Sequence, residues 1–308
     1  MIEEVTGDTL RIMIASSSDS NYYPLLSELF CSLKKHLQDS TNIQYSYGVV
    51  DAGIGPADLQ QLDHQGIIIR EMSDALSIPG FKLRGRKYLL STFVRAYLPE
   101  YYPGYDIYIW MDADSWICNK EVIELYIKGA QKERIALVCG ADRANKQVTN
   151  ISKWIGPWAR IKNFYMKNAR GAGLSWKEAQ TLSIKPTLLS GNFALKNNAP
   201  HWKNYQSNIE KIIKRGRIFG SDQLALGMTV YLDNLPAELL PAWCNWTGTP
   251  MLDEDENKFV EPYLPHHPIG IIHMAGRDAM RADRSVTTPV KTTKGNVVDM
   301  SLRYGFLD

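Results

Sequence analysis

The central segment of the chain reads Gly104-Tyr-Asp-Ile-Tyr-Ile-Trp-Met-Asp112-Ala-Asp114-Ser-Trp-Ile117. Residues 107–111 are all apolar, aromatic or β-branched, which is typical of a strand buried on both faces. This strand ends in two carboxylates, Asp112 and Asp114, at the edge where open α/β sheets bind their ligands. Two adjacent carboxylates repel each other unless a cation lies between them, so the segment predicts a divalent-metal site beside a nucleotide-binding sheet. The alternative for an Asp-x-Asp sequence is an ordinary solvated turn.

The overall composition is that of a globular protein without a strong charge preference. The 308 residues can form one large domain or two modest ones, and the formal net charge of +2 does not indicate a nucleic-acid partner. The acidic residues 1–4 are unlike a signal peptide, and no apolar run approaches the roughly 20 residues that span a bilayer. Four scattered cysteines suit a reducing compartment, and the sequons at Asn150 and Asn245 are interpreted as chance. We therefore expect a soluble cytoplasmic protein.

Buried strands alternate with amphipathic helices along the chain. Apolar runs predict strands at residues 10–15, 43–50, 66–70, 107–111, 135–139, 186–195 and 271–272. Helical spacing of apolar residues predicts helices at residues 24–37, 83–98, 121–131, 202–215 and 221–231, the last with Ser221 as its N-cap. This alternation predicts an α/β fold, with a mostly parallel sheet flanked by helices.

Residues 142–186 interrupt this alternation. Nine Lys or Arg residues there face two acidic ones, Asp142 and Glu178, so the segment carries a surplus of seven positive charges. Five aromatic residues are interleaved with them: Trp154, Trp158, Phe164, Tyr165 and Trp176. We predict a single domain of residues 1–308, with a basic helical insertion at 142–186 and a C-terminal segment, 236–308, that wraps around it.

Four short motifs follow one another along the chain. They are Asp19-Ser-Asn21-Tyr22 after the first strand, Phe93-Val-Arg95 seventeen residues ahead of Asp112, Asp112-Ala-Asp114 itself, and Ile271-Ile-His273-Met-Ala-Gly276. In these motifs the chain resembles the retaining glycosyltransferases of the GT-A fold, most closely family 8, which includes bacterial lipopolysaccharide galactosyl- and glucosyltransferases and glycogenin. The resemblance spans residues 10 to about 280. It implies a Rossmann-like sheet that binds a nucleotide-diphospho-sugar.

The resemblance further implies metal-dependent transfer of a hexose from a UDP-sugar. Asp112, Asp114 and His273 are the implied metal ligands, a set that suits Mn²⁺, with Mg²⁺ as the second choice. The implied contacts to the sugar nucleotide are Asp19, Asn21 and Tyr22 at the uridine, Arg95, then Ser190, Gly191 and Asn192 at the sugar, and Gly276 with Arg277 at the diphosphate. Three of these residues also have a purely structural alternative. His273 could be hydrogen-bonded within the end of a strand, Arg95 could lie on a solvated helix surface, and Asp19 could only stabilise a turn.

Asp222 and Gln223 are the pair that the resemblance places beneath the anomeric carbon. Retaining glycosidases use two nearby carboxyl groups, one of them as a nucleophile, and no such pair is evident here apart from the aspartates of the metal motif. We therefore expect attack from the face of the leaving group, with a phosphate oxygen helping to take the acceptor's proton. Asp222 would orient the sugar hydroxyls, and the carbonyl of Gln223 would stabilise developing positive charge. The alternative for Asp222 is a favourable charge at a helix N-terminus.

The chain departs from the family pattern in two places. Where the family has a lysine three residues after His-x-x-Gly, this chain has Ala279, and Arg277 or Arg281 could supply the missing charge. The family's Asn-Ala-Gly sugar loop is replaced by Ser, Gly and Asn at residues 190–192, so the identity of the sugar does not carry over. These departures leave two alternatives open: a catalytically inactive sugar-nucleotide-binding protein and a sugar-nucleotide hydrolase.

The basic, aromatic insertion suggests two binding partners other than the sugar nucleotide: the acceptor and an anionic membrane surface. Trp on sugar faces and Lys or Arg on phosphates suit a glycan, lipopolysaccharide or protein acceptor. The same charges suit peripheral contact with the anionic inner face of a membrane, where each basic residue adds about 1 kcal/mol. The alternative is an ordinary helical lid whose tryptophans lie in the core.

Overall fold

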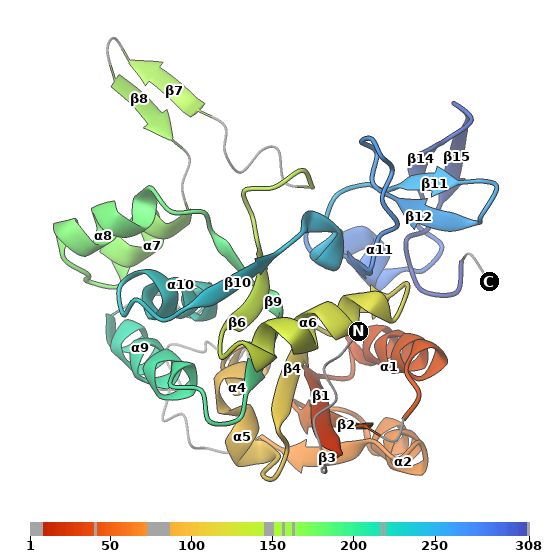
Figure 1. The fold of residues 1–308 in the computed structure, drawn as a ribbon, viewed down its shortest axis with the longest axis horizontal. Coiled ribbons are helices and arrows are strands. Elements are labelled where there is room, and N and C mark those ends of the chain that lie inside the picture. The colour runs from red at the N-terminus through yellow and green to blue at the C-terminus, as the bar shows by residue number, and fades with distance from the viewer. Residues whose placement is uncertain are drawn as a thin grey trace.

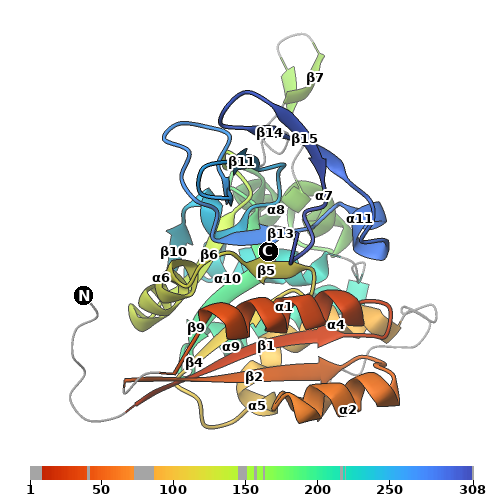
Figure 2. The same ribbon diagram turned by 90° about the vertical axis from the view of Figure 1, so that its right-hand side faces the viewer.

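Strand β1 (Leu10–Ser18) lies between two parallel neighbours, β2 (Ile43–Asp51) and β4 (Ile107–Met111). The computed structural model describes residues 9–39, 42–72, 87–144, 151–155, 158–161, 164–215, 218 and 220–306. Within them the main sheet has seven strands in the order β10-β6-β9-β4-β1-β2-β3 (Figures 1 and 2). The other four strands are β3 (Ile68–Glu71), β6 (Ile135–Cys139), β9 (Leu188–Lys196) and β10 (Ala237–Leu240). β9 runs antiparallel to both neighbours and the other described pairings are parallel, so the predicted mostly parallel α/β sheet is confirmed.

Helices cover both faces of the sheet because alternate residues of its central strands point to opposite sides. Ile12 and Ile14 of β1 lie in one apolar cluster with α1 (Tyr23–His36), α2 (Pro56–His64) and α6 (Glu121–Gln131). Met13 and Ala15 lie in a second cluster with α9 (His201–Arg215) and α10 (Ser221–Tyr231). Strand β4 is buried along its whole length, as its continuous apolar run predicts. None of the helices in the described ranges has both the length and the apolar character needed to cross a membrane.

The helix predicted at residues 83–98 is replaced by a chain of short turns where it is described. These are η1 (Lys87–Leu90), α4 (Ser91–Val94), η2 (Arg95–Tyr97) and α5 (Leu98–Tyr101), and residues 83–86 lie outside the described residues. The Thr92 hydroxyl donates to the carbonyl oxygen of Leu89, and Pro99 lacks a backbone donor, so both features work against one continuous helix. The break matters for the site because Arg95, at the start of η2, is turned inward and is only 5% exposed.

The basic segment of residues 142–186 combines a hairpin with two helices. Strands β7 (Ile151–Ile155) and β8 (Trp158–Ile161) form a hairpin that stands away from the main sheet (Figure 1), and α7 (Phe164–Gly171) and α8 (Trp176–Ser183) follow. The prediction of helices is therefore wrong for the first half of the segment. Short runs rich in Ile and Trp flank a Gly-Pro pair at residues 156–157, which favours a hairpin. The role of this segment as a lid stays a prediction.

Residues 236–308 contribute a second sheet that the sequence analysis does not predict. It has four strands in the order β12-β11-β14-β15: β12 (Lys258–Val260), β11 (Met251–Asp253), β14 (Thr288–Thr292) and β15 (Val297–Met300). Strands of three to five residues carry too little periodicity to be recognised from sequence. Separately, β13 (Ile271–His273) pairs with β5 (Ser115–Ile117), the strand that directly follows Asp114.

A buried ion pair attaches the end of the described chain to α1. Arg303 Nε and Nη2 donate to the two carboxylate oxygens of Glu28 at 2.7 and 2.8 Å. Arg303 Nη1 also donates to the carbonyl oxygen of Arg281 at 3.1 Å, in α11 (Asp278–Ala282). One side chain therefore holds α1 and α11 together.

We expect Arg303→Ala to lower the thermal midpoint of unfolding. Removing one partner of a buried pair costs about 3–5 kcal/mol, and the half-exposed Arg284, 3.3 Å from Glu28, should keep the loss near the lower end. Each kcal/mol corresponds to roughly 2 °C in a chain of this size, so a drop of about 6 °C is expected in differential scanning calorimetry.

The control for this experiment is Arg284→Ala, which removes only the exposed partner and should cost less than about 1 kcal/mol. Equal effects of the two substitutions would contradict the assigned role of Arg303.

Candidate active site

A large cavity lies at the carboxyl ends of β1 and β4. β1 pairs with β2 on one side and β4 on the other, so the chain leaves the sheet at a topological switch point, where open α/β sheets bind ligands. The cavity has a volume of about 790 Å³. Twelve of the fourteen predicted site residues line its wall, and the two that do not are Asn192 and Arg277.

Three of these residues form a compact cluster of potential metal ligands. Ligand atoms of Asp112, Asp114 and His273 all lie within 4.8 Å of one another. His273 Nε2 is 3.3 Å from Asp114 Oδ1 and 3.9 Å from Asp112 Oδ2. The cluster depends on the pairing of β5 with β13, because His273 lies directly opposite Ser115 in that ladder. Two carboxylates and one imidazole are hard and intermediate donors, which fits Mn²⁺ or Mg²⁺ rather than a thiolate-seeking metal.

A buried hydrogen-bond chain fixes the orientation of His273. Its Nδ1 is 2.9 Å from Asn245 Oδ1, an atom that also accepts from Asn192 Nδ2 at 2.9 Å. An amide oxygen can only accept, so Nδ1 carries a proton and Nε2 is the ring nitrogen that faces the two carboxylates. Asn192 is fully buried and lies behind His273, away from the cavity wall where a sugar contact was predicted.

Arg95 joins the metal motif to the opposite side of the cavity. Its Nη2 donates to Asp112 Oδ1 at 2.9 Å, and its Nη1 donates to the carbonyl oxygen of Ser190 at 2.7 Å. The same Nη1 lies 3.3 Å from Asp222 Oδ2. The guanidinium also lies 4.9 Å from the centre of the Trp110 ring, whose Nε1 donates to Asp112 Oδ1. A solvated position for Arg95 is therefore excluded.

Burial and neighbouring charges shift the pKa values of Asp112, Asp114 and His273. Burial raises the pKa of Asp112, and the positive charges of Arg95 and His273 only partly oppose this. Burial also acts to raise the pKa of Asp114, but His273 and Arg281 outweigh it and lower that pKa. Burial acts to lower the pKa of His273, but the charge of Asp114 and its hydrogen bond, followed by Asp112, raise it above the ordinary value. Asp114 is therefore held as an anion.

Helix α10 brings Asp222 and Gln223 to the cavity wall. Asp222 Oδ2 accepts from the Ser190 hydroxyl at 2.8 Å, and Gln223 Nε2 donates to the carbonyl oxygen of Leu188 at 2.8 Å. The helix begins after Gly220, whose φ of +77° suits glycine, so Gly220 is the N-cap and the prediction of Ser221 in that role is wrong. Gln223 lines the cavity, and its amide nitrogen is held by the Leu188 carbonyl oxygen.

The loop after β1 forms part of the cavity wall. Asp19 Oδ1 accepts from the backbone nitrogens of Asn21 and Tyr22 at 3.0 and 3.1 Å, so the predicted turn is present. Tyr22 is 38% exposed, and Arg281 lies 5.7 Å from its ring centre. Since Asp19, Asn21 and Tyr22 all line the cavity, the turn presents them to a ligand.

The structure distinguishes the two arginines that follow Gly276. Arg281 lines the cavity, and its Nη1 donates to Asp114 Oδ2 at 2.8 Å. Arg277 points elsewhere and donates to the Thr249 hydroxyl at 2.9 Å. Gly276 lines the cavity with a φ of +77°, a backbone conformation that glycine adopts without strain.

Two residues of the site carry no recognisable sequence signal for the roles they have. Trp110 is visible only as part of a buried strand, yet it donates to Asp112. Asn245 reads as part of a sequon, yet it is fully buried and holds His273. Both roles arise from tertiary packing.

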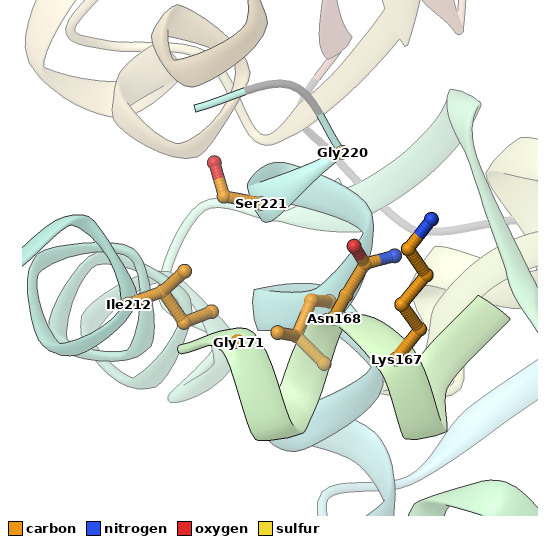
Figure 3. Close-up of a pocket in the computed structure, with 7 residues that line it drawn as sticks. Lys167, Asn168, Gly171, Ile212, Gly220 and Ser221 are labelled. Atoms are coloured by element: carbon orange, nitrogen blue, oxygen red, sulfur yellow. The ribbon is translucent and has the colours of Figure 1, made fainter. Parts of the chain in front are cut away.

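A second, smaller cavity of about 100 Å³ adjoins the large one at Gly220. Figure 3 shows Lys167, Asn168 and Gly171 of α7 on one side and Ile212 and Ser221 on the other. The basic insertion therefore reaches the edge of the candidate active site.

We expect Gly191→Ala to abolish metal binding without unfolding the protein. A Cβ at this position would lie 2.5 Å from His273 Cε1 and 2.7 Å from Asp112 Oδ2, so the two ligands would have to move apart. The checks are a titration with Mn²⁺ and the thermal midpoint.

The matched control is Gly55→Ala, where the new Cβ meets only ordinary contacts at 3.6 Å. Metal binding by Gly191→Ala at the strength of this control would refute the assigned ligand geometry.

Comparisons with known proteins agree with this architecture. Residues 13–164 match the sequence model of glycosyl transferase family 8. No curated protein matches the chain significantly in sequence.

Solved structures are similar in fold at low sequence identity. The apo structure of the bifunctional glycosyltransferase WbbM is 16% identical with a TM-score of 0.53, over 89% of this chain and 47% of that one, so this chain spans about half of WbbM. The galactosyltransferase LgtC, in complex with donor and acceptor sugar analogs, is 12% identical with a TM-score of 0.52, over 87% of each chain. Mouse xyloside xylosyltransferase 1 in its apo form is 11% identical with a TM-score of 0.51, over 88% of this chain and 99% of that one. The family match over residues 13–164 and the shared fold together support a glycosyltransferase similar to family 8, with the GT-A fold.

Proposed function

We propose that this glycosyltransferase moves a hexose from a UDP-sugar to a glycan, lipopolysaccharide or protein acceptor, with retention of configuration and with Mn²⁺ as its preferred metal. The observation that carries the proposal is the cluster of Asp112, Asp114 and His273 in the wall of the 790 Å³ cavity. A divalent cation held there would neutralise the diphosphate as it leaves the sugar. The side chains around this cluster would bind the donor and stabilise the charge that develops on the sugar.

The protein supports the donor at three points along the cavity. The turn held by Asp19 presents Tyr22 for stacking on the base, while Asp19 and nearby backbone groups are left to select the base. Arg281 offers a guanidinium at the cavity wall, where a diphosphate would lie next to the metal ligands. Ser190, Gly191 and Asp222 line the end where the sugar would lie.

Asp222 and Gln223 suit a retaining reaction without a carboxylate nucleophile. Asp222 Oδ2 is engaged by the Ser190 hydroxyl and lies 3.3 Å from Arg95, which suits it for orienting hydroxyls rather than for attack on carbon. Gln223 is anchored through its nitrogen, so its carbonyl dipole is fixed and can stabilise positive charge developing on the anomeric carbon. We therefore favour attack on the face from which the diphosphate leaves.

The acceptor is proposed to approach from the basic insertion. Phe164 lines the large cavity, and Lys167 lines the small cavity beside it (Figure 3). An aromatic ring and an exposed ammonium group suit a sugar that carries phosphate or another anionic group. The same positive charges would favour peripheral contact with an anionic membrane face.

We expect UDP to stabilise the wild-type protein in the presence of Mn²⁺, while Asp114→Asn should lose this effect and keep its fold. A ligand at about 100 times its Kd adds about 2.7 kcal/mol, which raises the thermal midpoint by roughly 2 °C or more. The measurement is a thermal-shift panel of UDP, GDP, ADP and CMP with and without Mn²⁺. The control is Asp283→Asn on the exposed surface beyond α11, which should behave as wild type.

The panel separates the competing outcomes. A shift with GDP or CMP in place of UDP would overturn the proposed donor, and a metal-dependent UDP shift in Asp114→Asn would refute the metal assignment. Release of free hexose from a UDP-sugar that acceptors never suppress would favour a hydrolase.

We expect charge reversal at Arg160, Lys162 and Lys167 to raise the acceptor KM and weaken binding to anionic liposomes. Loss of three favourable charges removes about 1 kcal/mol each at an anionic surface. Steady-state kinetics with a phosphorylated glycan and a liposome sedimentation assay provide the measurements, and the UDP-induced thermal shift serves as the control for an intact donor site. Unchanged values in both assays would leave the insertion as an ordinary lid.

A further inference from the structure

Arg281 makes an ion pair with Asp114, a member of the proposed metal cluster. Its Nη1 donates to Asp114 Oδ2 at 2.8 Å, and Nη2 bonds to the Asp278 carboxylate. Arg281 also lies beside the ring of Tyr22, on the loop proposed to hold the base. One cation therefore touches both the metal motif and the donor end of the cavity.

Two arginines pair with the carboxylates around the proposed metal cluster. Three carboxylates, of Asp112, Asp114 and Asp222, are contacted by the guanidinium groups of two arginines, Arg95 and Arg281. A divalent cation arriving alone would meet the guanidinium of Arg281 at Asp114, and the repulsion between these like charges would oppose its binding. A nucleoside diphosphate would bring negative charge that attracts both cations.

The two arginines differ in their freedom to respond. Arg95 is 5% exposed and is held by Asp112, Asp222 and the Ser190 carbonyl oxygen. The Arg281 side chain is 20% exposed, its Nε has no hydrogen-bond partner, and its second carboxylate partner, Asp278, is 87% exposed. Arg281 is therefore the cation that can turn from Asp114 toward an anion in the cavity.

We propose that Arg281 makes metal binding conditional on the donor nucleotide. In the free protein its charge compensates Asp114 and opposes a divalent cation. When the diphosphate is present, Arg281 pairs with it instead, and the cation takes over the compensation of Asp114. Binding of metal and nucleotide is then mutually reinforcing, and by linkage each raises the affinity of the other by the same factor. This inference rests on the proposed function, since it assumes a nucleoside diphosphate in the cavity.

The test compares Arg281→Gln with Arg284→Gln. Arg284 is half-exposed, lies beyond α11 and pairs with Glu28, so its substitution removes the same charge from the same segment without touching the site. Binding of Mn²⁺ is measured from the paramagnetic resonance signal of the free ion, with and without UDP, and binding of UDP by calorimetry with and without Mn²⁺. The thermal midpoint and circular dichroism of each variant report whether it is folded.

Opposite changes in the two affinities are expected for Arg281→Gln. Mn²⁺ should bind about tenfold more tightly in the absence of UDP, and UDP should bind about tenfold more weakly in the presence of Mn²⁺. Arg284→Gln should match the wild type in both titrations. Arg281→Lys, which keeps the charge, should retain most of the coupling between the two ligands.

Two failures can be told apart. If the wild type binds Mn²⁺ and UDP but Arg281→Gln binds Mn²⁺ no more tightly than wild type does, the role of Arg281 is wrong and the proposed function stands. If the folded wild type binds neither ligand under any combination, the proposed function fails and this inference fails with it.

Discussion

The buried guanidinium of Arg95 is the constraint on which the geometry of the site depends. It pairs with Asp112 and Asp222 at once, although these carboxylates belong to the end of β4 and the start of α10. Each of them would be costly to bury without a partner, so the arginine fixes how far apart the two ends of the cavity lie. Its planar, multi-donor group serves both carboxylates and the Ser190 carbonyl oxygen at once, which the single ammonium of a lysine would do less well.

The inward orientation of the Arg95 side chain depends in turn on the short, irregular turns of residues 87–101. A continuous helix over residues 87–101 would carry its polar residues along one solvated stripe, whereas the short turns observed there re-aim Arg95 into the sheet edge. The cation then stacks on Trp110, which is itself positioned by the strand that ends in Asp112. Local irregularity and a regular strand thus cooperate to build one charged cluster.

The sequence alone predicts those elements that a local pattern of apolar and polar residues specifies. The strand that ends at Met111 is a continuous apolar run, and Asp112 and Asp114 follow from their place after it. The strand predicted at residues 10–15 extends to Ser18, because the three serines after the apolar run continue its pairing with β2. The place of His273 beside them was implied by resemblance and depends on a strand pairing across more than a hundred residues. The hidden role of Asn245 has no local pattern at all, because it exists only once β13 lies against the segment that carries this residue.

The short strands of residues 251–300 illustrate the same limit in the fold. Their apolar residues gather in a cluster with Trp116 and Leu25, which lie far away in the sequence. A strand of three residues is stabilised almost wholly by such distant partners, so its own sequence holds little information about it. The family match, by contrast, ends at residue 164, before this part of the chain begins.

The burial of Asn245 has a practical consequence for making the protein. Asn245-Trp-Thr247 is a sequon, and a secretory pathway attaches glycans to such sites while a chain is still unfolded. A glycan on this amide could not be accommodated in a fully buried position, and the acceptor that orients His273 would be lost. Expression through a glycosylating secretory route would therefore disrupt the cluster of Asp112, Asp114 and His273 before the chain folded, whereas a host that leaves asparagine unmodified would preserve it.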